Sequence, residues 1–243
     1  MFNREIFLGV LVQVALLGTL DAVIGLGPAG WIAGTVYGIA VGAFLTYGLH
    51  RSTARSLGPA DAVTLGRSAL VGCVTALVVD TAGREIVAMV VIASVALALD
   101  AVDGQVARRT GTESPLGARF DMEVDAYLIL ILSVVVAQSL GPWVLTIGAM
   151  RYAFVAASWQ WPWLNSPLPP SIARKTVAAV QGIVLVAATS ALLPMWGTYA
   201  VTVGALGLLT WSFGRDTWWL LEQHAFGVVA HVETKPRVTA DAA

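Results

Sequence analysis

The chain has 243 residues, of which 57% are hydrophobic and only 12% charged, and its mean hydropathy is +0.77. A soluble domain carries about 25% charged residues, so this composition excludes an ordinary soluble protein and indicates an integral membrane protein. The formal net charge of −1 argues against nucleic acid as a partner.

Apolar stretches of the length that a membrane helix needs, about 20 residues each, recur along the chain as far as residue 213. Glycine, proline and polar residues separate them. We therefore predict eight helices, over residues 6–26, 30–48, 68–83, 85–108, 117–139, 142–160, 175–193 and 195–213. The first stretch has no small-residue cleavage pattern, so we expect a retained helix and not a signal peptide.

The distribution of lysine and arginine predicts the orientation, because short cytoplasmic loops carry an excess of these residues. With the N-terminus inside, almost all of the 14 basic residues fall on the cytoplasmic side. The exceptions are Arg84, which is placed outside, and Arg151, which lies within a predicted helix. We therefore expect a multi-pass membrane protein with both termini in the cytoplasm.

Four aspartates stand where the helix predicted over 85–108 ends and the helix predicted over 117–139 begins. Asp100 and Asp103 are three residues apart, and Asp121 and Asp125 are four apart, so each pair occupies one face of its helix. The two faces can meet across the short loop at the cytoplasmic surface.

Four carboxylates that converge near a membrane repel one another and lose hydration unless something neutralises them. Oxygen ligands suit Mg²⁺ or Mn²⁺. A pair of such ions stabilises both the attacking and the leaving oxygen in a displacement at phosphorus. The aspartates therefore predict a site for two divalent metal ions.

Small residues lie between the aspartates. Gly104, Ala107 and Gly117 remove side-chain bulk where a nucleotide or diphosphate could approach the backbone, and Arg108 supplies a forked donor for a phosphate. Close packing of membrane helices is the other explanation of small residues. Next to the aspartates, the nucleotide interpretation is favoured.

One pattern in this window resembles the complete signature of the CDP-alcohol phosphotransferase family: Asp100-x-x-Asp103-Gly104-x-x-Ala107-Arg108, then Gly117-x-x-x-Asp121-x-x-x-Asp125. The resemblance implies an all-α membrane protein with a core of six helices, here about residues 60–215, preceded by two extra transmembrane helices. We therefore expect two N-terminal helices and a cytoplasmic loop over 1–57, a catalytic domain over 58–216 and a cytoplasmic tail over 217–243.

The resemblance also implies roles for the matching positions. Asp100, Asp103 and Asp121 would ligate two Mg²⁺ or Mn²⁺ ions, and Asp125 would be both a ligand and the base for the acceptor hydroxyl. The CDP site would be lined by Gly104, Ala107, Arg108 and Gly117. An activated alcohol would attack the lipid-side phosphorus of a CDP-linked lipid donor, expected to be CDP-diacylglycerol, and CMP would leave. Similarity to the family also suggests a homodimer.

The segment from Pro59 to Arg67 is similar to an interfacial segment of this family that usually reads Asn-x-x-Thr-x-x-Arg. Thr64 matches the threonine and is the candidate for a contact with cytidine. Asp61 replaces the asparagine, and it either caps the helix that begins nearby or accepts a hydrogen bond from the amine of the base.

Arg151 lies about halfway through an apolar helix, where a guanidinium is costly and faces a polar cavity or a partner. One interpretation is a salt bridge, for example to one of the site aspartates. The other is an anion pocket, formed with Arg174 and Lys175 beside the metals. Such a pocket would bind a phosphorylated acceptor, such as inositol phosphate or glycerol 3-phosphate.

A cation transporter is the alternative from a different functional class. A transporter would place its acidic residues near the bilayer midplane at broken helices, whereas these aspartates cluster at the cytoplasmic interface beside Arg108. The sequence therefore favours a phospholipid-synthesising transferase.

Overall fold

The computed structural model describes residues 4–51, 58–81, 85–110, 114–169 and 171–233, with side chains for all of these except residues 59–60, 81, 101, 103–110 and 226–233. This part of the chain is helical apart from short connections. Its α-helices are α1 (Arg4–Ile24), α2 (Pro28–Arg51), α3 (Pro59–Thr81), α4 (Ile86–Thr110), α5 (Pro115–Leu140), α6 (Leu145–Gln160), α7 (Ile172–Thr189) and α8 (Met195–Glu233). Two short 3-10 helices, η1 (Pro142–Val144) and η2 (Pro162–Asn165), flank α6. The predicted all-α fold is confirmed.

The described helices include four that are long and apolar enough to cross a membrane: α1, α2, the Asp61–Asp80 part of α3, and α7. The outer surfaces of α1 and α2 carry large apolar side chains such as Phe7, Leu11, Ile32 and Ile39, all exposed. A soluble protein rarely exposes so much contiguous apolar surface. These faces fit contact with lipid, as expected for an integral membrane protein.

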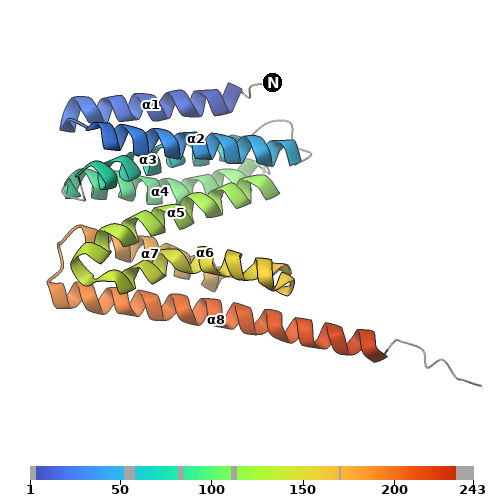
Figure 1. Ribbon diagram of the computed structural model, residues 1–243. Coiled ribbons are helices and arrows are strands. Elements are labelled where there is room, and N and C mark those ends of the chain that lie inside the picture. The colour runs from blue at the N-terminus through green and yellow to red at the C-terminus, as the bar shows by residue number, and fades with distance from the viewer. Residues whose placement is uncertain (1–3, 52–57, 82–84, 111–113, 170, 234–243) are drawn as a thin grey trace, which may run out of the picture.

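Helix α3 is the central helix of the bundle. It packs against α1, α2, α4 and α5, and 67% of its candidate span is buried, compared with 17% for α1 and for α2. Figure 1 shows α1 and α2 on one side of the bundle and α8 on the other, with α3, α4 and α5 between them. A side chain on α3 can therefore reach both α4 and α5.

The start of α3 differs from the prediction, because the helix begins at Pro59 and not near residue 68. Proline suits the first position of a helix, where its missing N–H is not needed. The Asp61 carboxylate accepts the backbone N–H of Gly58 at 2.9 Å, which is one half of a capping box. The capping interpretation of Asp61 therefore agrees with the structure. Hydropathy marks the apolar part of a helix and not its polar first turns.

The end of α8 also differs, since the helix continues to Glu233 and does not end near residue 213. It is the longest helix described and extends beyond the others in Figure 1. Charged residues such as Arg215, Asp216 and Glu222 end the apolar stretch without ending the helix. Helix formers of this kind continue a helix into a polar environment.

The start of α2 is capped by a side chain of the central helix α3. The carboxylate of Asp80, near the end of α3, accepts the backbone N–H of Gly27 at 2.9 Å and of Gly30 at 3.4 Å. These N–H groups belong to the first turn of α2 and have no partner within the helix. A Cβ atom at either glycine would collide with Asp80, so glycine is required for this approach.

Helix α2 also contacts α5 through two aromatic pairs. The ring centroids of Tyr37 and Tyr127 are 4.8 Å apart, and those of Phe44 and Phe120 are 6.2 Å apart. Tilted pairs at these distances are favourable. Phe120 precedes Asp121 in the chain and Tyr127 follows Asp125. Helix α2 thus supports the segment of α5 that carries the two aspartates.

Candidate active site

The start of α5 is fixed by local sequence. Ser114 is its N-cap residue, with a hydroxyl oxygen that accepts the backbone N–H of Gly117 at 2.8 Å, and Pro115 follows at the first helical position. Asp121 and Asp125 lie one turn apart on the helix that begins here, so their side chains share a face.

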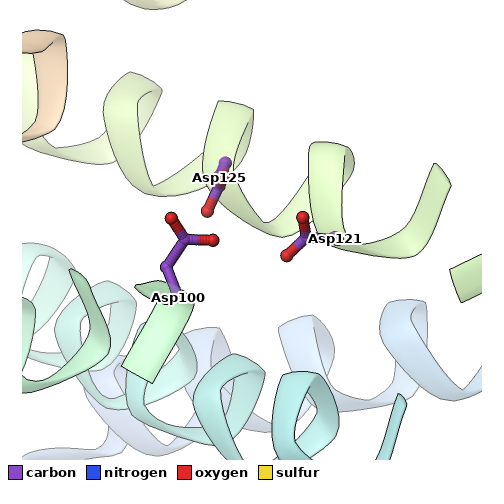
Figure 2. Close-up of side chains that lie close together, drawn as sticks. All are labelled: Asp100, Asp121 and Asp125. Carbon is purple, nitrogen blue, oxygen red and sulfur yellow. The ribbon is translucent and has the colours of Figure 1, made fainter. Parts of the chain in front are cut away.

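Three of the four predicted aspartates come together in the structure. Asp100 of α4 and Asp121 and Asp125 of α5 each offer a carboxylate oxygen, and these oxygens lie within 4.8 Å of one another. Figure 2 shows the side chain of Asp100 on α4 next to those of Asp121 and Asp125 on α5. Oxygens that share one divalent ion at 2.0–2.6 Å are at most about 5 Å apart, so the three carboxylates fit a hard metal ion. We call them the carboxylate cluster.

The other residues of the predicted signature lie on the last turns of α4. The helix backbone continues to Thr110, but the side chains of Asp103, Gly104, Ala107 and Arg108 lie outside the described residues. Their roles as a metal ligand and as CDP contacts therefore remain predictions.

A fourth side chain joins the carboxylate cluster from α3. The guanidinium of Arg67 forms ion pairs with all three carboxylates: its Nη1 lies 3.3 Å from Oδ1 of Asp100 and also pairs with Asp125, while its Nη2 pairs with Asp121. The forked, planar guanidinium suits such simultaneous contacts. Sequence reasoning treated Arg67 only as the end of a matched segment. The spacing of Asp61, Thr64 and Arg67, each three residues apart, could have indicated that Arg67 lies on the same side of the helix as the other candidate site residues.

Thr64 and Gly117 lie next to this cluster. Thr64 is buried and precedes Arg67 by one turn of α3, so the two side chains are on the same face. Gly117 is buried where α5 approaches α3, and a Cβ atom here would collide with the carboxylate of Asp61. Close helix packing therefore accounts for this glycine, and its predicted contact with CDP remains untested.

Arg151 of α6 forms an ion pair with Glu123 of α5. The salt-bridge interpretation therefore fits, but the partner is Glu123 and not a site aspartate. Glu123 is two residues from both Asp121 and Asp125, a spacing that places it on the opposite side of a helix with 3.6 residues per turn. Helix α5 thus carries the carboxylate cluster on one face and the Arg151–Glu123 pair on the other.

Arg174 meets a different set of residues, at the start of α7 and the middle of α8. Its Nη1 lies 3.3 Å from Oδ2 of Asp216, and the Nη2 of Arg215 lies 2.9 Å from the other oxygen of the same carboxylate. Arg215 also donates to the hydroxyl of Ser171, the N-cap of α7, at 3.4 Å. Lys175 is exposed nearby on α7. Arg151 and Arg174 therefore pair with different acidic residues on different helices. From the sequence, Arg215 was only assigned to the cytoplasmic side, and its contacts with Asp216 and Ser171 were not predicted.

The model of the CDP-alcohol phosphatidyltransferase family matches residues 58–212, which is more than half of the chain. The chain belongs to this family. Comparisons with curated proteins and with solved structures gave no match. The predicted resemblance is thereby confirmed.

CDP-alcohol phosphatidyltransferases are transferases that move a phosphatidyl group from a CDP-linked alcohol in phospholipid synthesis, and they use divalent metals. The matched region contains the whole carboxylate cluster and Arg67, whereas α1 and α2 precede it. The phosphatidyltransferase core is therefore built on α3 to α8, and the N-terminal helices are packed onto its central helix.

Proposed function

We propose that this protein transfers a phosphatidyl group from CDP-diacylglycerol to a polar alcohol and releases CMP. The observation that carries the proposal is the convergence of Asp100, Asp121 and Asp125 from two helices inside the family region. The three side chains are 31–37% exposed, so a water-soluble substrate and metal ions can reach them.

In the proposed mechanism, the carboxylates of Asp100, Asp103, Asp121 and Asp125 would hold two Mg²⁺ or Mn²⁺ ions. When bound, these ions would neutralise the diphosphate of the donor and the phosphate of the departing CMP. A carboxylate oxygen of Asp125 takes the proton from the acceptor hydroxyl. The hydroxyl oxygen then bonds to the phosphorus that carries diacylglycerol, the bond from this phosphorus to the bridging oxygen breaks, and CMP leaves with that oxygen.

The proposed CDP site includes Thr64 and Gly117 with the signature residues Gly104, Ala107 and Arg108. Support for Thr64 comes from its position on α3, one turn before Arg67 of the carboxylate cluster. Gly117 packs against Asp61, so its place in the proposal rests on the signature. Thr64 offers a hydroxyl that can donate to or accept from a base or ribose.

The proposed acceptor is a phosphorylated alcohol, such as inositol phosphate or glycerol 3-phosphate. Arg174 and Arg215 share the single carboxylate of Asp216, which leaves an excess of positive charge at the N-terminus of α7, an end that itself favours anions. Lys175 adds to this excess. The support for Arg151 is weaker, because Glu123 balances its charge.

We further propose that the active site and both termini face the cytoplasm and that the protein forms a homodimer. The ends of α2 and α4 and the starts of α3 and α5 lie at the same end of the bundle in Figure 1. Arg51, Arg67 and Arg119 belong to these helix ends, and such an excess of basic residues is typical of the cytoplasmic side.

The alternative function, a cation transporter, has less support. Transporters place their ion sites at interrupted helices, whereas α4 and α5 are continuous helices where Asp100, Asp121 and Asp125 lie.

The test is release of CMP from CDP-diacylglycerol by the purified protein with Mg²⁺ or Mn²⁺. The acceptors are inositol phosphate, glycerol 3-phosphate, inositol and serine. We expect turnover with a phosphorylated acceptor, none after removal of metal by a chelator, and none in Asp125→Asn. Asp21→Asn, an exposed position on α1, is the matched control. Undiminished turnover in Asp125→Asn would contradict the mechanism. Turnover with only serine or inositol, and none with a phosphorylated acceptor, would contradict the acceptor proposal.

A further inference from the structure

Arg67 approaches the carboxylate cluster from inside the bundle. Its side chain has 0% exposure, whereas the carboxylates that it contacts are 31–37% exposed. The guanidinium therefore forms the inner wall of the cluster, and the accessible side of the carboxylates faces away from α3.

The charges of this cluster are unequal. Among the side chains that the structure describes, one guanidinium faces three carboxylates, whose oxygens lie within 4.8 Å of one another. Without a cation, carboxylates at this separation repel one another strongly in a partly buried site. Arg67 thus supplies the positive charge that keeps the three side chains together when no metal is bound.

A divalent ion and Arg67 would interact with the same three carboxylate groups. The guanidinium contacts Oδ1 of Asp100, of Asp121 and of Asp125, and a metal held by these carboxylates would lie only a few ångströms from it. Like charges at such a distance repel each other, and partial burial strengthens the repulsion. The guanidinium and the metal ions therefore cannot both hold all three carboxylates at full strength.

We propose that Arg67 is the resident counter-ion of the metal-free site and that divalent ions bind in competition with it. Binding of the metal releases at least one carboxylate from the guanidinium, and loss of the metal returns it. This inference rests on the proposed function, because it requires the aspartates to be metal ligands. It makes Arg67 a positioning residue that keeps the site assembled between metal-binding events and lowers its affinity for metal.

The first test measures Mn²⁺ binding to the purified full-length protein by electron paramagnetic resonance, with no substrate present. Thermal unfolding is followed with and without Mn²⁺. In Arg67→Met we expect Mn²⁺ to bind at least about tenfold more tightly, because a nearby positive charge is removed. We also expect a lower unfolding temperature without metal, and a larger Mn²⁺-induced rise than in the wild type.

Arg119→Met is the matched control, since Arg119 is exposed on the same helix as Asp121. It removes the same charge from the surface, where salt screens it, so its Mn²⁺ affinity should stay within about twofold of the wild type. Equal or weaker Mn²⁺ binding in Arg67→Met than in the wild type would overturn the competition while leaving the metal site intact. Absence of Mn²⁺ binding in both proteins would overturn the proposed function as well.

A second measurement does not depend on the folding of a variant. The wild-type protein is prepared with Mn²⁺, and its structure is determined with the ion located by anomalous scattering. We expect the Arg67 guanidinium to have left at least one of the three carboxylates. Persistence of all three ion pairs with Mn²⁺ bound to the same aspartates would contradict the inference.

Discussion

Two arginine–aspartate clusters in the described part of the chain have opposite imbalances of charge. In the carboxylate cluster, one fully buried arginine faces three aspartates from α4 and α5. Between α7 and α8, two arginines share Asp216. A surplus of carboxylates attracts cations and a surplus of guanidinium groups attracts anions. The comparison therefore separates the proposed metal site from the proposed anion site, and the balanced Arg151–Glu123 pair on the other face of α5 favours neither.

The largest effect is expected at the carboxylate cluster. Asp121→Asn removes a proposed metal ligand, and CMP release should fall by at least about 100-fold, the order seen when a group that stabilises transition-state charge is lost. Turnover and the Mn²⁺ concentration for half-maximal activity are measured together. Asp216→Asn, its counterpart in the other cluster, should leave the Mn²⁺ dependence unchanged. An equal change in the Mn²⁺ dependence of both variants would contradict the distinction between the two clusters.

The next effect is expected at the second cluster, in which Arg174 and Arg215 share Asp216. Arg174→Gln or Arg215→Gln should raise the KM for the phosphorylated acceptor by about tenfold or more, because a hydrogen bond to a charged group contributes about 1.5–3 kcal/mol. The KM for CDP-diacylglycerol should not change. Arg151→Ala, which removes the balanced pair, should have a smaller effect on the acceptor. An equal rise for donor and acceptor would argue against a separate acceptor site.

A third effect concerns α2, which lies outside the family region but contacts α5, the helix that carries Asp121 and Asp125. Tyr37→Ala removes the ring that packs on Tyr127 and should destabilise the protein by about 3 kcal/mol, as for other large aromatic truncations. Tyr37→Phe keeps the ring and should retain most of the stability. Thermal unfolding in detergent provides the measurement. Equal unfolding temperatures for the alanine variant and the wild type would show that α2 does not support α5.

The smallest effect is expected at the cap between α3 and α2. Asp80→Ala removes the acceptor for the N–H groups of Gly27 and Gly30 and should cost about 1 kcal/mol, as for other helix caps. The metal dependence of turnover should be unchanged. The difference in unfolding temperature between this variant and the wild type checks the value. A loss of stability larger than that of Tyr37→Ala would show that the cap, and not the aromatic pair, is the stronger link between α2 and the core.

The sequence predicted the helical fold because each apolar stretch is as long as a membrane helix. It also predicted the convergence of Asp100, Asp121 and Asp125, because helical spacing places carboxylates on faces that a short loop brings together. It did not predict the start of α3 at Pro59 or the end of α8 at Glu233, since polar helical turns leave no hydropathy signal.

The partners of the arginines could not be predicted either. Arg67 meets its carboxylates across sequence separations of 54 and 58 residues, and such contacts depend on how whole helices pack. The same holds for Arg151, which pairs with Glu123 on the face of α5 opposite the cluster, and for Arg174, which meets Asp216 of α8. Helical spacing identifies the residues that share a face, but the neighbouring helix decides which charge lies opposite.

The central claim is that the carboxylate cluster is a metal site, and Mn²⁺ binding to Asp125→Asn tests it most directly. Binding is measured by electron paramagnetic resonance on folded, purified protein, with Asp21→Asn as the control. The account predicts an affinity at least about tenfold weaker than that of the wild type, because one charged ligand is lost, and no change in the control. Undiminished Mn²⁺ binding in Asp125→Asn would contradict it.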